Sequence, residues 1–130
     1  MGQCYAIKLK VKSKDEPKTV SLLKEFIATP GINFNIDKFR NEGVGTDTVD
    51  DLIRIIFAGY KKHTFETERQ KNGFKIFTNA FECCYGWERV MIDAFKKIAP
   101  TLENKSVLWI WPDNDYDKCI VQNGQFVFVH

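Results

Sequence analysis

The chain has 130 residues, of which 44% are hydrophobic, 28% charged and 14% aromatic. This length suits one domain with its own hydrophobic core, spanning residues 1–130, and the composition excludes a disordered chain. The formal net charge is only +2, from 19 basic and 17 acidic residues, which argues against a strongly basic protein that coats duplex nucleic acid.

The first residues give no targeting signal. "MGQCYAIKLKVK" has alternating lysines and lacks the apolar run of a signal peptide, and Ala6 stands where N-myristoylation requires Ser or Thr. No apolar stretch approaches the roughly 20 residues that span a bilayer. We therefore expect a cytoplasmic protein without membrane contact. Its cysteines are expected to stay reduced; they are Cys4, Cys83, Cys84 and Cys119.

A strand and a helix are predicted first. Residues 3–12 alternate, which indicates a strand with one buried face. The apolar side chains on one side are Tyr5, Ile7, Leu9 and Val11, and the lysines on the other are Lys8, Lys10 and Lys12. Pro17 favours the first turn of a helix, and Pro30-Gly31 ends it. The apolar stripe of this helix is formed by Val20, Leu23, Phe26 and Ile27.

A short strand over residues 32–39 and a second helix are predicted next. Thr48 is placed to cap this helix, with Asp51 three residues later. Its apolar face then runs to Tyr60. The residues on that face are Val49, Leu52, Ile53, Ile56, Phe57 and Tyr60.

Asn72-Gly73 predicts the turn of a hairpin. The second arm of the hairpin is apolar on both faces, so we expect it to lie centrally in the sheet. Residues 86–99 have the spacing of an amphipathic helix, which Pro100 ends. "SVLWIW" predicts a further strand, and "KCIVQNGQFVFV" a last hairpin.

The order β-α-(β)-α-β-β-α-β-β-β predicts an α+β fold. We expect a single-layer mixed, mostly antiparallel sheet with about three helices packed on one face and a ferredoxin-like tendency. The strand–helix–strand unit over 74–111 is expected to join parallel strands by a right-handed crossover.

The run "TNAFECCYGWERVMIDAFKKIAPTLENKSVLWIWPDNDYDKCIVQNG" resembles the second half of ferredoxin-like domains in small plasmid- and phage-borne accessory proteins. These domains pair a strand, a Trp-led helix, a Pro stop and a strand with an acidic exit. The resemblance covers the last part of the chain, consists mostly of hydrophobic spacing and carries over no functional residue. It implies a mobile-element accessory protein that binds something and lacks catalytic machinery.

Cys83 and Cys84 are the first candidates for chemistry. Adjacent cysteines on a strand point to opposite faces, and zinc sites usually draw on spaced pairs such as C-x₂-C, so no metal site is predicted. Cys84 precedes a helix N-terminus, which lowers the pKa of a thiol, and His63 is the internal candidate for its base. A thiol enzyme built on Cys84 is therefore one hypothesis. The alternative is that "FECCYGWE" is a strand-to-helix junction.

The acidic turn in "WIWPDNDYDK" is the main candidate for a partner site. Its aspartates alternate as the first ligands of a calcium-binding loop do, but Lys118 and Gly124 stand where that loop requires glycine and glutamate. Aromatic residues beside charge are common in protein interfaces. We predict a protein partner with a basic surface, bound through Trp109, Trp111, Asp113, Asp115, Tyr116 and Asp117.

Lysines on the first strand are the third candidate. Lys8, Lys10, Lys12 and Lys14 are expected on one face, where they suit a platform for single-stranded RNA or DNA. The other interpretation is that they protect an edge strand from pairing with other chains.

The sequence thus predicts a non-catalytic protein-binding module without a cofactor. The resemblance suggests an inhibitor of a host factor, of which an anti-defence protein such as an anti-CRISPR protein is one version. The single-stranded nucleic-acid binder and the thiol enzyme remain as the second and third alternatives. Exposed strand edges also make a homodimer plausible.

Overall fold

The structure, a computed structural model, describes residues 2–31, 36–58, 66–69, 73–84, 87–110 and 117–129; for residues 2, 3, 58, 66–69 and 81–84 it describes the backbone only. The strands are β1 (Gly2–Lys12), β2 (Glu66–Arg69), β3 (Phe74–Cys84), β4 (Val107–Trp109), β5 (Lys118–Gln122) and β6 (Gln125–Val129). The helices are α1 (Glu16–Ala28), α2 (Ile36–Asn41), α3 (Val49–Ala58) and α4 (Trp87–Ile98), with short 3-10 helices at Ser13–Asp15 (η1) and Ala99–Thr101 (η2).

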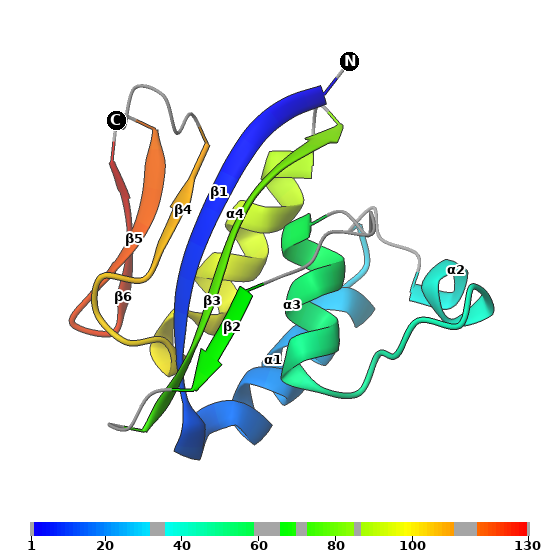
Figure 1. Cartoon of the computed structure of the whole chain (residues 1–130), viewed down its shortest axis with the longest axis horizontal. Coiled ribbons are helices and arrows are strands. Elements are labelled where there is room, and N and C mark those ends of the chain that lie inside the picture. The colour runs from blue at the N-terminus through cyan, green and yellow to red at the C-terminus, as the bar shows by residue number, and fades with distance from the viewer. Residues whose placement is uncertain are drawn as a thin grey trace.

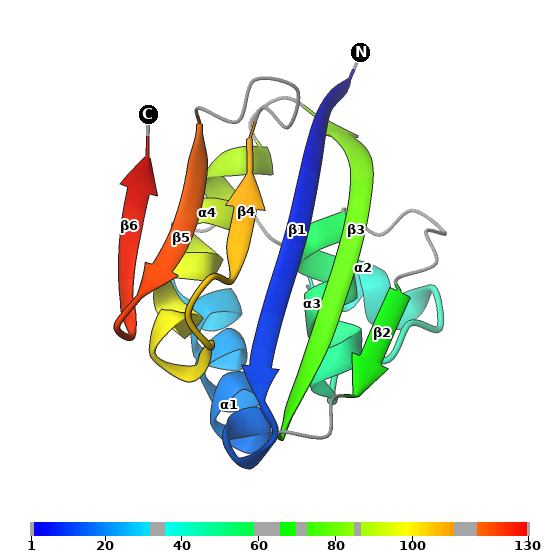
Figure 2. The ribbon, with the colours of Figure 1, turned by 60° about the vertical axis from the view of Figure 1, so that its left-hand side comes forward.

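The strands form one sheet in the order β2-β3-β1-β4-β5-β6 (Figure 2). Every pairing between these strands is antiparallel. β1 lies between β3 and β4, and β3 lies between β2 and β1, which confirms the central position predicted for the second arm of the first hairpin.

The first four strands have the split βαβ arrangement of ferredoxin-like folds. β3 and β4 both pair antiparallel with β1, so they are parallel to each other as predicted, but they are not neighbours. β1 and β2 are related in the same way, with β3 between them. The β5–β6 hairpin extends this sheet at the β4 edge, and α2 and α3 are additions to the first crossover.

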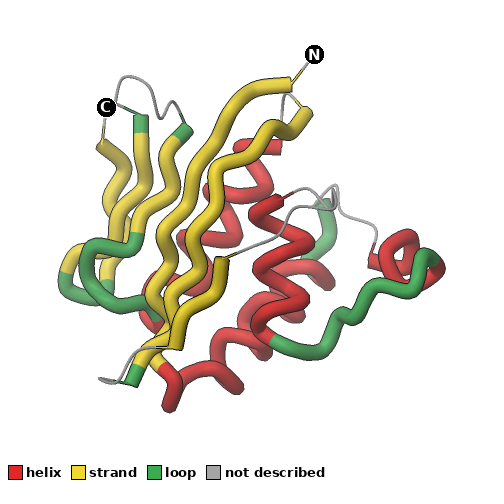
Figure 3. The backbone as a smooth tube through the Cα atoms, in the orientation of Figure 1, coloured by secondary structure: helices red, strands yellow, loops and turns green. Residues whose placement is uncertain are grey.

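The helices lie on one face of the sheet (Figures 1 and 3), which confirms the predicted α+β layering. α1, α3 and α4 pack against each other and against the sheet, whereas α2 lies outermost on the helical side. Among the described residues, no helix covers the opposite face of the sheet. That face is therefore the largest part of the fold left open.

The core lies between the sheet and the helices. The odd-numbered side chains of β1 face it, as the alternation predicted, because the helices cover that side. The apolar stripes predicted for the helices meet them there. The core includes Tyr5, Ile7, Leu9, Val11, Leu23, Phe26, Leu52, Ile53, Ile56, Phe57, Phe77, Met91, Phe95 and Ile98.

The strand predicted over 32–39 is wrong where the structure describes it. Ile36–Asn41 forms α2, and residues 32–35 lie outside the described residues. Ile36 and Phe39 are three positions apart, so a helix turns both toward one side; Phe39 is buried and Ile36 packs against the core. The alternating letters "INFNI" also fit a strand, and only the tertiary packing decides between the two.

The predicted cap and hairpin turn have the expected geometry. The backbone N–H of Asp51 donates to Thr48 Oγ1 over 3.1 Å at the start of α3. Asn123 and Gly124 have φ angles of 55° and 77°, which fit the type I′ turn predicted between β5 and β6.

Candidate functional site

The open face of the sheet is the candidate site. It carries the even-numbered side chains of β1, together with the residues of β3, β4 and β5 that pair with them. Small, apolar and basic residues alternate across this face. The described side chains on it are Cys4, Ala6, Lys8, Lys10, Lys12, Phe74, Ile76, Thr78, Ala80, Val107, Trp109, Lys118, Ile120 and Gln122.

Trp109 is the large side chain at the centre of this face. It pairs with Ala6, which in turn pairs with Ala80, so the indole stands beside two methyl-sized side chains. This difference in size leaves a hollow of about 360 Å³ next to the ring. Its lining is Ala6, Ile7, Lys8, Thr78, Asn79, Ala80 and Trp109.

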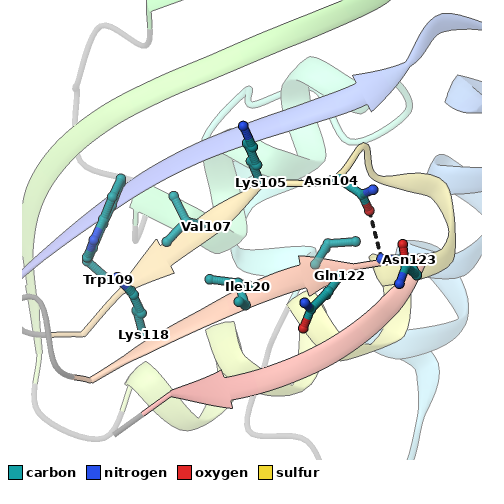
Figure 4. Close-up of a pocket in the computed structure, with 9 residues that line it drawn as sticks. Asn104, Lys105, Val107, Trp109, Lys118, Ile120, Gln122 and Asn123 are labelled. Carbon is teal, nitrogen blue, oxygen red and sulfur yellow. Dashed lines mark hydrogen bonds between the residues drawn. The ribbon is translucent and has the colours of Figure 1, made fainter.

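A second hollow lies on the other side of Trp109 (Figure 4). It measures about 510 Å³, and Val107 and Ile120 contribute apolar surface to it. The side chains at its ends are polar, and the backbone N–H of Asn123 donates to Asn104 Oδ1 over 2.8 Å. Its lining is Asn104, Lys105, Val107, Trp109, Lys118, Ile120, Val121, Gln122 and Asn123.

Lys105, at the rim of the second hollow, has an unusual backbone. Its φ angle is 73°, in the left-handed region that favours glycine. The N–H of Lys105 donates to the carbonyl oxygen of Val121 over 3.2 Å, which helps hold the turn against β5. A long cationic side chain therefore occupies a position where glycine would be less strained.

The lysines of β1 do not protect an edge, because β1 is paired on both sides. That interpretation of the sequence is therefore wrong. Lys8, Lys10 and Lys12 lie on the open face of a central strand, as expected, and Lys8 is exposed. Lys14 does not join them, since it belongs to η1 after the strand has ended.

The acidic turn is described only at its two ends. Trp109 closes β4 and is half-buried, and the N–H of Ile110 donates to the carbonyl oxygen of Asp117 over 2.8 Å. The remaining residues of the predicted partner site, Trp111, Asp113, Asp115 and Tyr116, lie outside the described residues. Their part in binding stays a prediction.

The cysteines lie in three different places, and Cys4 is exposed on β1. Cys119 is fully buried, and burial raises the pKa of its thiol from the usual 9.0 to about 12, so it is not a nucleophile. Cys83 and Cys84 end β3, and α4 begins at Trp87, which fits the junction hypothesis. The side chain of Cys84 and the whole of His63 lie outside the described residues, so the thiol-enzyme hypothesis is untested. Within the described part of the chain, no group of three or more His, Cys, Asp or Glu residues is arranged to hold a metal.

The sequence indicated some residues of this face and not others. Trp109 was predicted because it lies beside the acidic turn in sequence, and the lysines of β1 were predicted from their alternating positions. Ala6, Ala80 and Lys105 were not, since a hollow made by small residues depends on which strands are neighbours. The Asn-Lys turn gives no sequence signal for a left-handed lysine.

No helix within the described part of the chain is long and apolar enough to cross a membrane. Comparisons with protein-family models, with curated proteins and with solved structures give no match to this chain.

Proposed function

We propose that the chain is a non-catalytic protein-binding module, and that the open face around Trp109 is where its partner binds. The observation that carries this proposal is the position of Trp109 between two hollows on an uncovered sheet face. Tryptophan is enriched among the residues that contribute most to binding energy, and shallow hollows beside it accept side chains of a partner.

The neighbours of Trp109 favour a protein over stacked bases. Sheet platforms for single-stranded nucleic acid carry aromatic side chains on which successive bases stack. On the two central strands around Trp109, the described positions of the open face hold Ala6, Lys8, Thr78 and Ala80, none of which is aromatic. Val107 and Ile120 on the other side are aliphatic. Aliphatic hollows beside one indole suit apolar side chains of a polypeptide.

The biological setting within this proposal comes from the resemblance to plasmid- and phage-borne accessory domains. Small proteins of that kind act by occluding a host factor, so we propose a cytoplasmic inhibitor, with anti-defence activity such as inhibition of a CRISPR system as one version. A binding face without a cofactor is sufficient for such a role, since occlusion needs contact area and no chemistry.

Photo-crosslinking tests the proposal. A photoreactive amino acid at Gln122, exposed on the open face, should capture a defined protein from a lysate of the native host, and nuclease treatment should not change the product. The same label at Asp93, exposed on α4, should not capture it. Capture only from the helical side, or a product that nuclease abolishes, would contradict the proposal.

A pair of tryptophan variants separates binding from folding. Trp109→Phe should weaken binding of the purified partner by about tenfold or more with little change in stability. Trp87→Phe should leave binding unchanged and lower stability, because the Nε1–H of Trp87 donates to the carbonyl oxygen of Ile56 over 2.7 Å and links α4 to α3. Equal effects of both variants on binding would assign Trp109 a structural role only.

Single-stranded nucleic acid is the second candidate ligand. Because β1 is paired on both sides, its lysines are not needed to protect an edge and are available for phosphate contacts. Lys8, Lys10 and Lys12 form a row on the open face. A further hollow at the end of the row is lined by Lys12, Ser13, Lys14, Gly73, Phe74 and Glu103. We expect binding weaker than about 10 µM at physiological salt, because few phosphate contacts are available. Tighter binding with a steep salt dependence, abolished by replacing the three lysines of the row with alanine, would promote this candidate.

A further inference from the structure

We infer that the open face around Trp109 recognises an acidic segment of its partner protein, with an apolar side chain inserted beside the indole. This inference rests on the proposed protein-binding function and specifies the chemistry of the partner. The inference is based on the lysines beside Trp109, which complement an acidic partner, and on the apolar residues that line the two hollows.

The charged side chains that line the two hollows beside Trp109 are all lysines. Lys8 lines one hollow and Lys105 lines the other, so cationic side chains stand on both sides of the indole. Both lysines are exposed. Among the side chains that the structure describes, neither forms an ion pair. Carboxylates of a partner can therefore approach them without displacing an acidic residue of the described chain.

The backbone conformation of Lys105 supports a role for its side chain in binding the partner. The left-handed φ of 73° is costly for lysine, and the folded turn does not need a side chain at that position. The backbone bonds that hold this turn, from Lys105 N–H to Val121 O, from Ser106 N–H to Glu103 O and from Val121 N–H to Ser106 O, would all be kept by glycine. The lysine side chain instead places a cation at the rim of the hollow, where it can contact an anion.

A second copy of the chain is a poorer occupant of this face. Two copies docked face to face would bring the lysine rows of their β1 strands together, and like charges across an interface oppose association. The sequence predicted a basic partner from the acidic turn, of which Trp111, Asp113, Asp115 and Tyr116 lie outside the described residues. The described face favours the opposite sign.

A peptide-binding experiment tests this inference. The probes are three short fluorescein-labelled peptides of equal length: one of Asp and Leu, one of Lys and Leu, and one of Asp and Ser; an oligo-dT of similar length is the fourth. We expect the Asp–Leu peptide to bind about tenfold more tightly than each other probe in fluorescence anisotropy, with weaker binding at high salt.

Charge reversal provides the matched control. Lys8→Glu combined with Lys105→Glu should abolish binding of the Asp–Leu peptide. Lys18→Glu combined with Lys38→Glu changes the net charge equally at exposed helical positions and should leave binding intact. Both double variants should retain the wild-type circular dichroism spectrum, which shows that they are folded.

The remaining outcomes each overturn the inference. Equal or tighter binding of the Lys–Leu peptide would reverse the sign of the partner, and tightest binding of oligo-dT would identify a nucleic-acid site. Absence of binding to every probe would also reject an acidic ligand. If a partner captured through Gln122 still depends on Trp109 but tolerates the reversal at Lys8 and Lys105, the protein-binding function stands and only the acidic inference fails.

Discussion

Lys75 Nζ lies 2.5 Å from Asp50 Oδ1, and this ion pair joins β3 to the first turn of α3. The Lys75 side chain is only 15% exposed and also lies over the ring of Phe77, at 5.6 Å from the centroid. The Asp50 side chain is 32% exposed and lies near the positive end of the α3 dipole. Removing Asp50 therefore leaves a more deeply buried charge without its partner than removing Lys75 does.

Replacing the two partners in turn should have unequal effects. Asp50→Asn leaves a mostly buried ammonium without its carboxylate and should lower the free energy of unfolding by about 1–3 kcal/mol. Lys75→Met leaves a carboxylate that the helix N-terminus and solvent still stabilise, so the loss should be below about 1 kcal/mol. Urea unfolding measures both. Lys24→Met, which breaks the exposed pair with Asp47, is the control with a change within about 0.5 kcal/mol. Equal losses for Asp50→Asn and Lys75→Met would contradict this account.

The thiol of Cys119 makes stability depend on pH. Its pKa is raised by burial to about 12 in the folded state, so above pH 9 the unfolded chain loses a proton that the folded chain keeps. The stabilising contribution is complete below pH 9 and decreases by up to about 1.4 kcal/mol per pH unit up to pH 12. Cys119→Ala lacks this dependence. The stability difference between wild type and variant should therefore shrink from pH 7 to pH 10.5 in urea titrations under reducing conditions; a constant difference would mean that the thiol is not protected.

Glycine at position 105 should stabilise the fold and impair binding. Lys105→Gly removes the left-handed strain and should raise the free energy of unfolding by up to about 1 kcal/mol. Lys105→Ala keeps the strain and should show no such gain. Both variants should bind the Asp–Leu peptide less tightly than wild type, because both lose the cation. A gain in stability from alanine would contradict the strain account, and unchanged binding by both variants would show that Lys105 has no role in recognition.

The acidic turn can be tested by neutralising Asp113, Asp115 and Asp117 with asparagine. The melting temperature should stay the same or rise slightly, because repulsion between like charges is relieved. If the face binds an acidic segment, association of the Asp–Leu peptide should be at least as fast as in wild type in stopped-flow measurements at low salt, with a smaller effect at high salt. A tenfold slower association with the host partner would instead support the basic partner predicted from the turn.

Periodicity predicted most of the fold. The alternation in residues 3–12, the capping threonine at Thr48 and the turn at Asn123-Gly124 all correspond to observed features, because each depends on neighbours in sequence. The order of strands in the sheet does not depend on sequence neighbours. One interpretation therefore placed β1 at an edge, whereas it is central. The strand predicted over residues 32–39 was wrong for the same reason. The apolar residues there fit a strand or a helix, and only the burial of Phe39 against the core decides for the helix α2.

The candidate site was less predictable than the fold. Trp109 was expected in an interface because of its sequence neighbours, yet the surface that surrounds it comes from strands far apart in the chain. The pairing of Ala6 with both Ala80 and Trp109 is a property of the sheet, and the hollow exists only because of it. The lysines that line the hollows beside Trp109 also come from separate parts of the chain, β1, β5 and the turn before β4, so their proximity to Trp109 was not predictable from sequence neighbours.

The central position of β1 determines when the fold can be completed during synthesis. β1 leaves the ribosome first, but its partners follow much later, with Gly2 opposite Cys84 and Ala6 opposite Trp109. Such distant pairings slow folding, because a long loop must close before any pairing is gained. Until β4 emerges, one side of β1 has unpaired backbone groups next to apolar side chains, which is a template for joining other nascent chains. Translation stalled before Val107 should therefore yield aggregates, whereas release of the whole chain should yield folded protein.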